Sequence, residues 1–177
     1  MLKLHFFARA GAIAAVVGAL VLPSAALAAT AIGSLTVNAS VAATCRVSST
    51  STVSFGAYDP TASSNLQVAG AIAIACTKNT AIISIDLDNG LHVSGTTRQM
   101  SDGTDVIAYQ LFKPSTNAAG AACAYTTAWT TGTTNGLVPP LAPDNSPRSF
   151  NVCGQTTQGS NVGVGAYTDT VQVTVNY

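Results

Sequence analysis

Residues 167–177 alternate between apolar and polar side chains with a period of two. The odd positions are apolar, with Asp169 as the exception, and the even positions are polar. The apolar set is Tyr167, Val171, Val173, Val175 and Tyr177. Because successive side chains of a β-strand point to opposite faces, this pattern predicts a strand with one buried face.

Other segments show strand-like patterns and are separated by turn signals. The sequences Asp88-Asn89-Gly90 and Asp102-Gly103 are typical of turns. No window predicts a convincing amphipathic helix, and the proline-rich residues 113–148 are expected to be largely loop. The predicted strands are 45–55, 66–77, 81–87, 106–112, a weaker 149–154 and the terminal 167–177. Short strands with turns between them predict an all-β sandwich.

The composition supports strands and excludes several classes of protein. Of the 177 residues only 8% are charged and the formal net charge is zero, whereas a typical soluble domain is about 25% charged. Nucleic-acid binding needs a basic surface, and a charge-rich disordered chain needs many more charges. We therefore expect no nucleic-acid partner, and the abundance of hydroxyl and amide side chains suits strands and turns.

The N-terminus has the features of a secretory signal peptide. Lys3 and Arg9 precede an apolar run over 11–22, and Ala26-Leu27-Ala28 offers small residues at a cleavage site. A transmembrane anchor is the alternative, but the run is shorter than the roughly 20 residues that span a bilayer. Residues 1–28 are therefore predicted to be removed on export, which leaves a length suited to one domain.

Four cysteines remain in the predicted mature chain: Cys45, Cys76, Cys123 and Cys153. An even number in an exported protein predicts two disulfide bonds. A metal site would lack both a C-x-x-C pair and a supply of histidines. Three pairings are possible, and the spacing favours Cys45–Cys76 and Cys123–Cys153, each stabilising by roughly 3–4 kcal/mol through a closed loop of about 30 residues.

Candidate catalytic chemistry is sparse. The sole histidine of the mature chain, His92, lies beside the Asn-Gly turn and is expected to be solvated. The stretch from Asp86 to Gly90 resembles part of a calcium loop but lacks the glutamate that closes one. We predict no catalytic residue, no metal and no cofactor. Aromatic residues could instead line a sugar site, although core packing is commoner for such residues: Tyr109, Phe112, Tyr125 and Trp129.

A second alternating segment, residues 30–43, precedes the first cysteine. Its apolar parity comprises Leu35, Val37, Ala39 and Val41, and polar residues fill the positions between them. This segment has no hairpin partner next to it. It could be an ordinary first strand of its own domain. It could also insert into a neighbouring copy by β-strand addition, a head-to-tail contact that builds a fibre.

An ordered set of short matches gives the chain a family resemblance. The matches are Ala43-Thr44-Cys45-Arg46-Val47, Phe55-Gly56-Ala57-Tyr58, Ile74-Ala75-Cys76-Thr77, Arg98-Gln99-Met100, Tyr109-Gln110-Leu111-Phe112 and the terminal 167–177. With these elements the chain resembles the spore coat protein U family, which includes the archaic chaperone–usher pilins of Gram-negative bacteria.

The resemblance implies an incomplete immunoglobulin-like sandwich of six strands plus an N-terminal donor strand. A strand from a periplasmic chaperone or from a neighbouring subunit would complete it. Further implied partners are an outer-membrane usher and copies of the chain itself or sister pilins. The implied function is a structural subunit of a surface fibre that supports adhesion or biofilm formation, exported through the periplasm to the cell surface.

By position, the resemblance also assigns roles to residues. Residues 29–43 would be the donor-strand extension and 44–177 the pilin-like domain. Leu35, Val37, Ala39 and Val41 would fill pockets of the neighbour, the strand 167–177 would form one wall of the acceptor groove, and Cys45–Cys76 would match the family's disulfide. The alternatives are a spore or cell coat protein of the same fold and a secreted carbohydrate-binding module.

Overall fold

The structure, a computed structural model, describes residues 28–177. The predicted signal peptide, residues 1–28, lies outside the described residues except for Ala28. The chain divides after Ala39 into two units. Residues 28–39 are exposed and form no strand, and residues 40–43 are likewise outside any strand. The described residues contain no helix that could cross a membrane.

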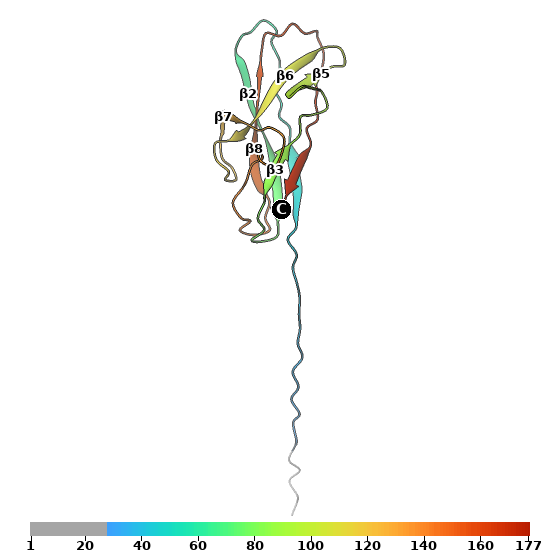
Figure 1. The fold of residues 1–177 in the computed structure, drawn as a ribbon, viewed down its shortest axis with the longest axis vertical. Helices are drawn as coiled ribbons and strands as arrows, with labels where there is room; N and C mark the ends of the chain where they lie inside the picture. Colours follow the sequence, from blue (N-terminus) through green and yellow to red (C-terminus); the bar gives the residue numbers. More distant parts are fainter. Residues whose placement is uncertain (1–27) are drawn as a thin grey trace, which may run out of the picture. The chain divides into compact units, whose positions relative to one another are not determined.

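The domain from Ser40 to Tyr177 is built from nine strands, which confirms the all-β class (Figure 1). Their bounds are β1 Cys45–Ser51, β2 Asn65–Cys76, β3 Ser84–Leu87, β4 Val93–Ser94, β5 Thr97–Ser101, β6 Val106–Pro114, β7 Cys123–Ala128, β8 Arg148–Thr157 and β9 Val173–Asn176.

Two sheets of very unequal width form the layers of the sandwich. The larger sheet has the order β1-β2-β8-β6-β5-β4, with β7 paired to β6, and every pairing is antiparallel. The smaller sheet holds β3 and β9, and Leu137 adds a single bridge to Ile85. One layer is therefore much narrower than the layer that it covers, as in an incomplete immunoglobulin-like sandwich.

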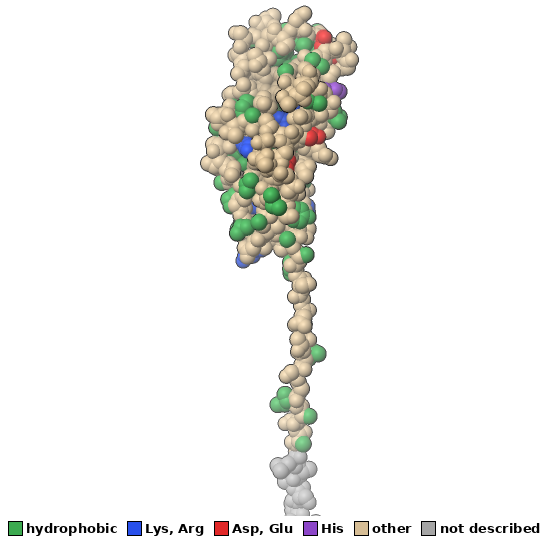
Figure 2. Space-filling model, viewed as in Figure 1, with side chains coloured by type: hydrophobic (Ala, Val, Ile, Leu, Met, Phe, Trp, Pro, Cys, Tyr) green, Lys and Arg blue, Asp and Glu red, His purple; other side chains and the backbone are tan. Residues whose placement is uncertain are grey.

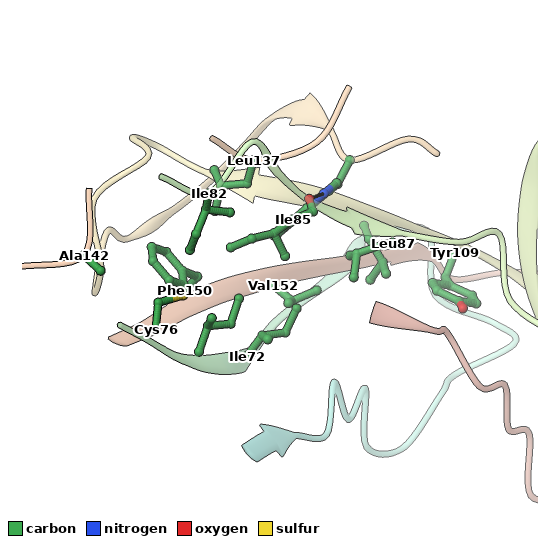
Figure 3. Packing of buried hydrophobic residues seen from close by; sticks show 13 residues of the cluster. Ile72, Cys76, Ile82, Ile85, Leu87, Tyr109, Leu137, Ala142, Phe150 and Val152 are labelled. Atoms are coloured by element: carbon green, nitrogen blue, oxygen red, sulfur yellow. Dashed lines mark hydrogen bonds between the residues drawn. The ribbon is translucent and has the colours of Figure 1, made fainter. Parts of the chain in front are cut away.

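The core lies between these layers and comes from the inward-facing parity of the strands. Ile72 and Ile74 of β2, Phe150 and Val152 of β8, and Ile85 of β3 are all buried. Figure 3 shows this cluster as a row of apolar side chains, with Ala142 at one end and Tyr109 at the other. Along each strand, apolar residues face inward and polar residues face outward. Burial of the apolar surface between the two layers therefore stabilises their packing.

Both disulfides have the pairing that the spacing favours. Cys45 is bonded to Cys76 across β1 and β2, and Cys123 is bonded to Cys153 between β7 and β8. Each closes a loop of about 30 residues, so each restricts the unfolded chain to a similar extent.

The strand count and several boundaries differ from the sequence-based expectation. The predicted strand 81–87 begins only at Ser84, and the weaker strand 149–154 extends over Arg148–Thr157. The hairpin β4–β5 and strand β7 were not predicted, so the domain has nine strands where six were expected. The terminal strand covers only Val173–Asn176, because Thr168 makes a lone bridge to Ser101 and residues 169–171 have no ladder partner within the described chain. The predicted strand 45–55 likewise ends at Ser51, where the chain leaves β2.

Candidate functional site

An apolar groove of about 1000 Å³ runs along the open side of the sandwich. One wall is the segment 50–58 that follows β1, and the other is the segment 162–173 that leads into β9. The floor consists of core side chains from both sheets, namely Ile72, Leu87, Ile107, Tyr109, Leu111 and Val152. Its apolar floor and two extended walls give this groove the form of a site for one missing strand.

The first wall depends on two glycines in the large sheet. At Gly70, an added Cβ would lie 2.8 Å from Val53 Cγ2, and at Gly154 it would overlap Val53 Cγ1 and approach Phe55. Glycine at both positions lets residues 52–56 lie directly on the sheet. Phe55 then packs against Tyr109 of the floor, with ring centroids 6.2 Å apart. Sequence reasoning missed these glycines, although glycine inside a strand pattern is a known sign of close backbone approach.

The second wall is anchored by Asp169, the exception to the alternation of the terminal segment. Its Oδ2 accepts a hydrogen bond from the Tyr109 hydroxyl at 2.6 Å, and its Oδ1 accepts the backbone N–H groups of Leu91 and His92 at 2.8 and 3.2 Å. Burial, with the hydrogen bond to Asp169, raises the pKa of Tyr109, so the phenol keeps its proton. The acid at this inward position therefore fixes the wall to the floor.

Buried Arg98 holds the end of β3 beside the floor. Its Nε donates to the Asp88 carbonyl at 2.8 Å and its Nη2 to the Leu87 carbonyl at 3.3 Å. Nη1 donates to Gln110 Oε1 at 3.3 Å, and the side chain is only 1% exposed. Burial lowers the pKa of Arg98, but guanidinium remains charged at any ordinary pH. Sequence reasoning missed this role because Arg98 breaks the alternation of β5.

Backbone groups on both walls are unused. Within residues 28–177, residues 52–56 and 169–171 make no backbone–backbone hydrogen bond. Buried backbone groups are normally paired, and the edge of a sheet is where an additional strand pairs. The groove thus presents hydrogen-bonding edges beside an apolar floor.

The predicted wall residues divide into two groups. Tyr167, Val171 and Val173 line the groove. Val175 and Tyr177 do not line it: Val175 packs on the core beyond the groove, and Tyr177 is 51% exposed. The difference arises because β9 joins the small sheet at Val173, after which its inward side chains are already covered.

The predicted donor side chains are exposed. Leu35, Val37 and Val41 are 89%, 85% and 82% exposed, and Ala39 is exposed as well. Apolar side chains arranged in a strand pattern are usually buried, so this exposure is unusual.

The residues considered for other chemistry have structural roles. The indole of fully buried Trp129 donates to the Ile85 carbonyl at 3.0 Å, and Phe112 packs edge-on against Tyr125. Asp88 accepts the N–H groups of Gly90 and Gln172, as a turn residue does. Within residues 28–177, no group of three or more His, Cys, Asp or Glu side chains could hold a metal ion.

Comparison with known proteins adds the family. The family model of the Spore Coat Protein U domain matches residues 31–174, which include the segment ahead of β1. The chain belongs to the spore coat protein U domain family. This confirms the family resemblance drawn from the short motifs.

One solved structure similar to this spore coat U domain is the CsuC–CsuE chaperone–tip adhesion subunit pre-assembly complex from archaic chaperone-usher Csu pili of Acinetobacter baumannii. The sequence identity is 25% and the TM-score is 0.46. The match covers 77% of this chain and 40% of that chain, so this chain spans less than half the length of the matched one. Among curated proteins, no sequence matches this chain.

Proposed function

We propose that the protein is a structural subunit of a surface fibre, an archaic chaperone–usher pilus, that polymerises by donor-strand exchange. One observation carries the proposal: the domain has an open apolar groove suited to a strand, while the same chain exposes an apolar strand pattern at residues 35–41. In a fibre, the exposed segment of one copy would occupy the groove of the next.

The energetics favour such an exchange. Burial of Leu35, Val37 and Val41 would contribute roughly 1.5–3 kcal/mol each, with less from Ala39. Backbone hydrogen bonds to residues 52–56 and 169–171 would add about 1 kcal/mol net each. Burial and hydrogen bonding of the inserted segment supply these free energies without any covalent change, so assembly needs no chemical reaction. The role proposed for the chain is therefore structural rather than catalytic.

The open groove also explains the partners that the family implies. An exposed apolar floor between unpaired edges favours aggregation. A periplasmic chaperone that lends a strand would cover the groove until an outer-membrane usher replaces that strand with the segment of the next subunit. Export to the cell surface, and a contribution of the fibre to adhesion and biofilm formation, belong to the same proposal.

Two alternative functions would give different results in the experiment described below. A spore or cell coat protein of the same fold would use the groove without forming thin filaments. A secreted carbohydrate-binding module would be a soluble monomer when produced alone, and burial of Trp129 removes the side chain best suited to stacking on a sugar.

The test compares two single substitutions in the exposed segment. Val37→Asp places a charge on the apolar parity, and Thr36→Asp places it on the polar parity as a matched control. Polymers should appear as ladders on detergent gels that collapse only on strong heating, and as filaments by electron microscopy. We expect ladders from the wild type and from Thr36→Asp but none from Val37→Asp. Ladders of wild-type intensity from Val37→Asp would overturn the proposal.

A further inference from the structure

The two ends of the domain carry opposite charge. β1, β2 and β8 meet at one end, where Arg46 pairs with Ala75 and Arg148 pairs with Ile74. Lys78 follows β2 at the same end, and one acid, Asp144, lies beside it. We call this the basic end, defined by Arg46, Lys78 and Arg148.

The opposite end is acidic. Asp59 is held by Gln158, whose Oε1 accepts the Asp59 N–H at 3.0 Å just beyond the end of β8. Asp102 and Asp105 flank the turn between β5 and β6. β5 ends and β6 begins at this end of the sheet, so the turn lies there as well. We call this the acidic end, defined by Asp59, Asp102 and Asp105. No Lys or Arg occurs in residues 51–77, 99–112 or 149–177.

The charges of the two ends do not cancel within one molecule. β2 has 12 residues and runs from the acidic to the basic end, which separates them by roughly 35 Å at the usual rise per residue. This is several times the Debye length of about 10 Å at 0.1 M salt.

Hydrogen bonds from Thr61 lower the pKa of Asp59, and backbone hydrogen bonds from Asp105 and Thr104 lower that of Asp102. In Figure 2, Lys and Arg side chains appear at the lower end of the domain and also near its middle, and Asp side chains appear near the top and near the middle.

The groove opens at the acidic end. On one wall, Asp59 lies between the lining residues Tyr58 and Pro60. On the other, Asp105 Oδ2 accepts the N–H of Gly163, which also lines the groove, at 2.8 Å. Toward the basic end the groove stops at the packed core, where Ile74 and Ile85 are 0% exposed. A bulky domain attached closely to an inserted strand can therefore follow it only at the acidic end.

The segment that would be inserted is attached directly to the basic end. Val41 lines a hollow of about 640 Å³ together with Arg46 and Lys78. Only residues 42–44 separate Val41 from Cys45, the first residue of β1, and this link spans at most about 14 Å when fully extended. A copy that places Val41 in a neighbour's groove must bring its own basic end to the mouth of that groove.

We infer that successive copies of this chain make a second, electrostatic contact, in which the basic end of one copy docks on the acidic end of the copy that receives its strand. This inference rests on the proposed function. The short link between Val41 and β1 sets the direction of insertion, with Val41 at the mouth and Leu35 at the inner end near Ile72 and Leu87. Opposite charges also steer the encounter before the strand enters.

The experiment follows ladder formation by the full mature chain at 50 mM and 1 M NaCl. We expect the rate to fall about tenfold at high salt, because salt screens steering between exposed charges. The pair Arg46→Glu and Lys78→Glu should slow assembly to a similar extent at low salt. Adding Ser63→Lys and Thr104→Lys lowers the negative charge of the three acids at the acidic end from three to one, so it should recover part of the lost rate. A control pair on β7, Thr126→Glu and Thr127→Glu, should leave it unchanged.

A peptide of residues 30–43 separates this inference from the proposed function, since the segment carries no charged side chain. The receiver is the full chain with Val37→Asp, whose own segment cannot insert. The peptide should bind it equally fast at both salt concentrations. Failure of the peptide to bind would overturn the proposed function. A second outcome would overturn only the docking of opposite ends. In that outcome the peptide binds, but the rate of ladder formation changes neither with salt nor with the Arg46→Glu, Lys78→Glu pair.

Discussion

The Tyr109 hydroxyl donates a 2.6 Å hydrogen bond to Asp169 Oδ2, and this bond joins the floor of the groove to the wall that precedes β9. Tyr109 belongs to β6 of the large sheet, whereas Asp169 lies outside any strand, between the Thr168–Ser101 bridge and β9. Asp169 also accepts two backbone N–H groups from the loop after β3. The shape of the groove therefore depends on one carboxylate that serves three donors.

This bond predicts a loss of stability at alkaline pH. The pKa of Tyr109 is raised in the folded protein, whereas a tyrosine of the unfolded chain titrates near pH 10. The stabilising contribution is thus complete below about pH 10, and above it the unfolded chain loses a proton that folded Tyr109 retains. The free energy of unfolding should then fall by up to about 1.4 kcal/mol per pH unit. Urea unfolding of wild type and Tyr109→Phe between pH 8 and 11 measures this, and equal slopes for both would contradict it.

Gly154→Val should displace the first wall. The new side chain would occupy the space of Val53 Cγ1, so residues 52–56 would lift from the sheet. We expect a loss of about 1–3 kcal/mol in unfolding free energy, as for other overpacked sites, and weaker binding of the 30–43 peptide. Ala69→Val, on the exposed face of the adjoining strand β2, is the control and should change neither.

Arg98→Met should destabilise the fold although it keeps an apolar stem. The buried Leu87 carbonyl and the partly buried Asp88 carbonyl would lose their guanidinium donors, and an unsatisfied buried acceptor costs about 1–3 kcal/mol. Arg46→Met, at an exposed position, should stay within about 0.5 kcal/mol of the wild type. Thermal unfolding of the two variants compares them directly, and similar melting temperatures would exclude the role given to Arg98.

Removal of either disulfide should cost about 3–4 kcal/mol, because both close loops of about 30 residues. The variants are Cys45→Ala with Cys76→Ala, and Cys123→Ala with Cys153→Ala. Denaturant midpoints, measured with an unchanged slope, give the loss. A loss below about 1 kcal/mol in either variant would show that the chain-entropy argument fails for this loop.

The sequence predicts the strands whose inward positions are all apolar. Residues 66–77 and 106–112 correspond to β2 and β6, since their alternation satisfies both local preference and core packing. β5 lacks this signal because Arg98 takes an inward position, where distant carbonyls satisfy it. β7 lies in a proline-rich stretch, and its pairing with β6 depends on contacts far away in sequence.

The candidate site was predictable only in part. The alternation of residues 167–177 indicates one wall, but the place of Asp169 depends on Tyr109 and on the loop at Leu91, neither of which is near it in sequence. The first wall depends on Gly70 and Gly154. The sequence alone does not show that the segment after β1 lies against these two glycines. The pattern of residues 30–43 is that of a strand, yet those residues form none within the described chain.

The pairing of β2 with β8 also determines when the domain can fold. Asn65 pairs with Thr157, and this ladder lies inside the large sheet, with β1 on one side of it and β6 on the other. The sheet cannot close until most of the chain has been made, and sheets dominated by such distant pairings fold slowly. The chain therefore spends an extended period with incomplete edges before the groove exists. Under the proposed function, a chaperone would protect those edges from early in folding as well as after it.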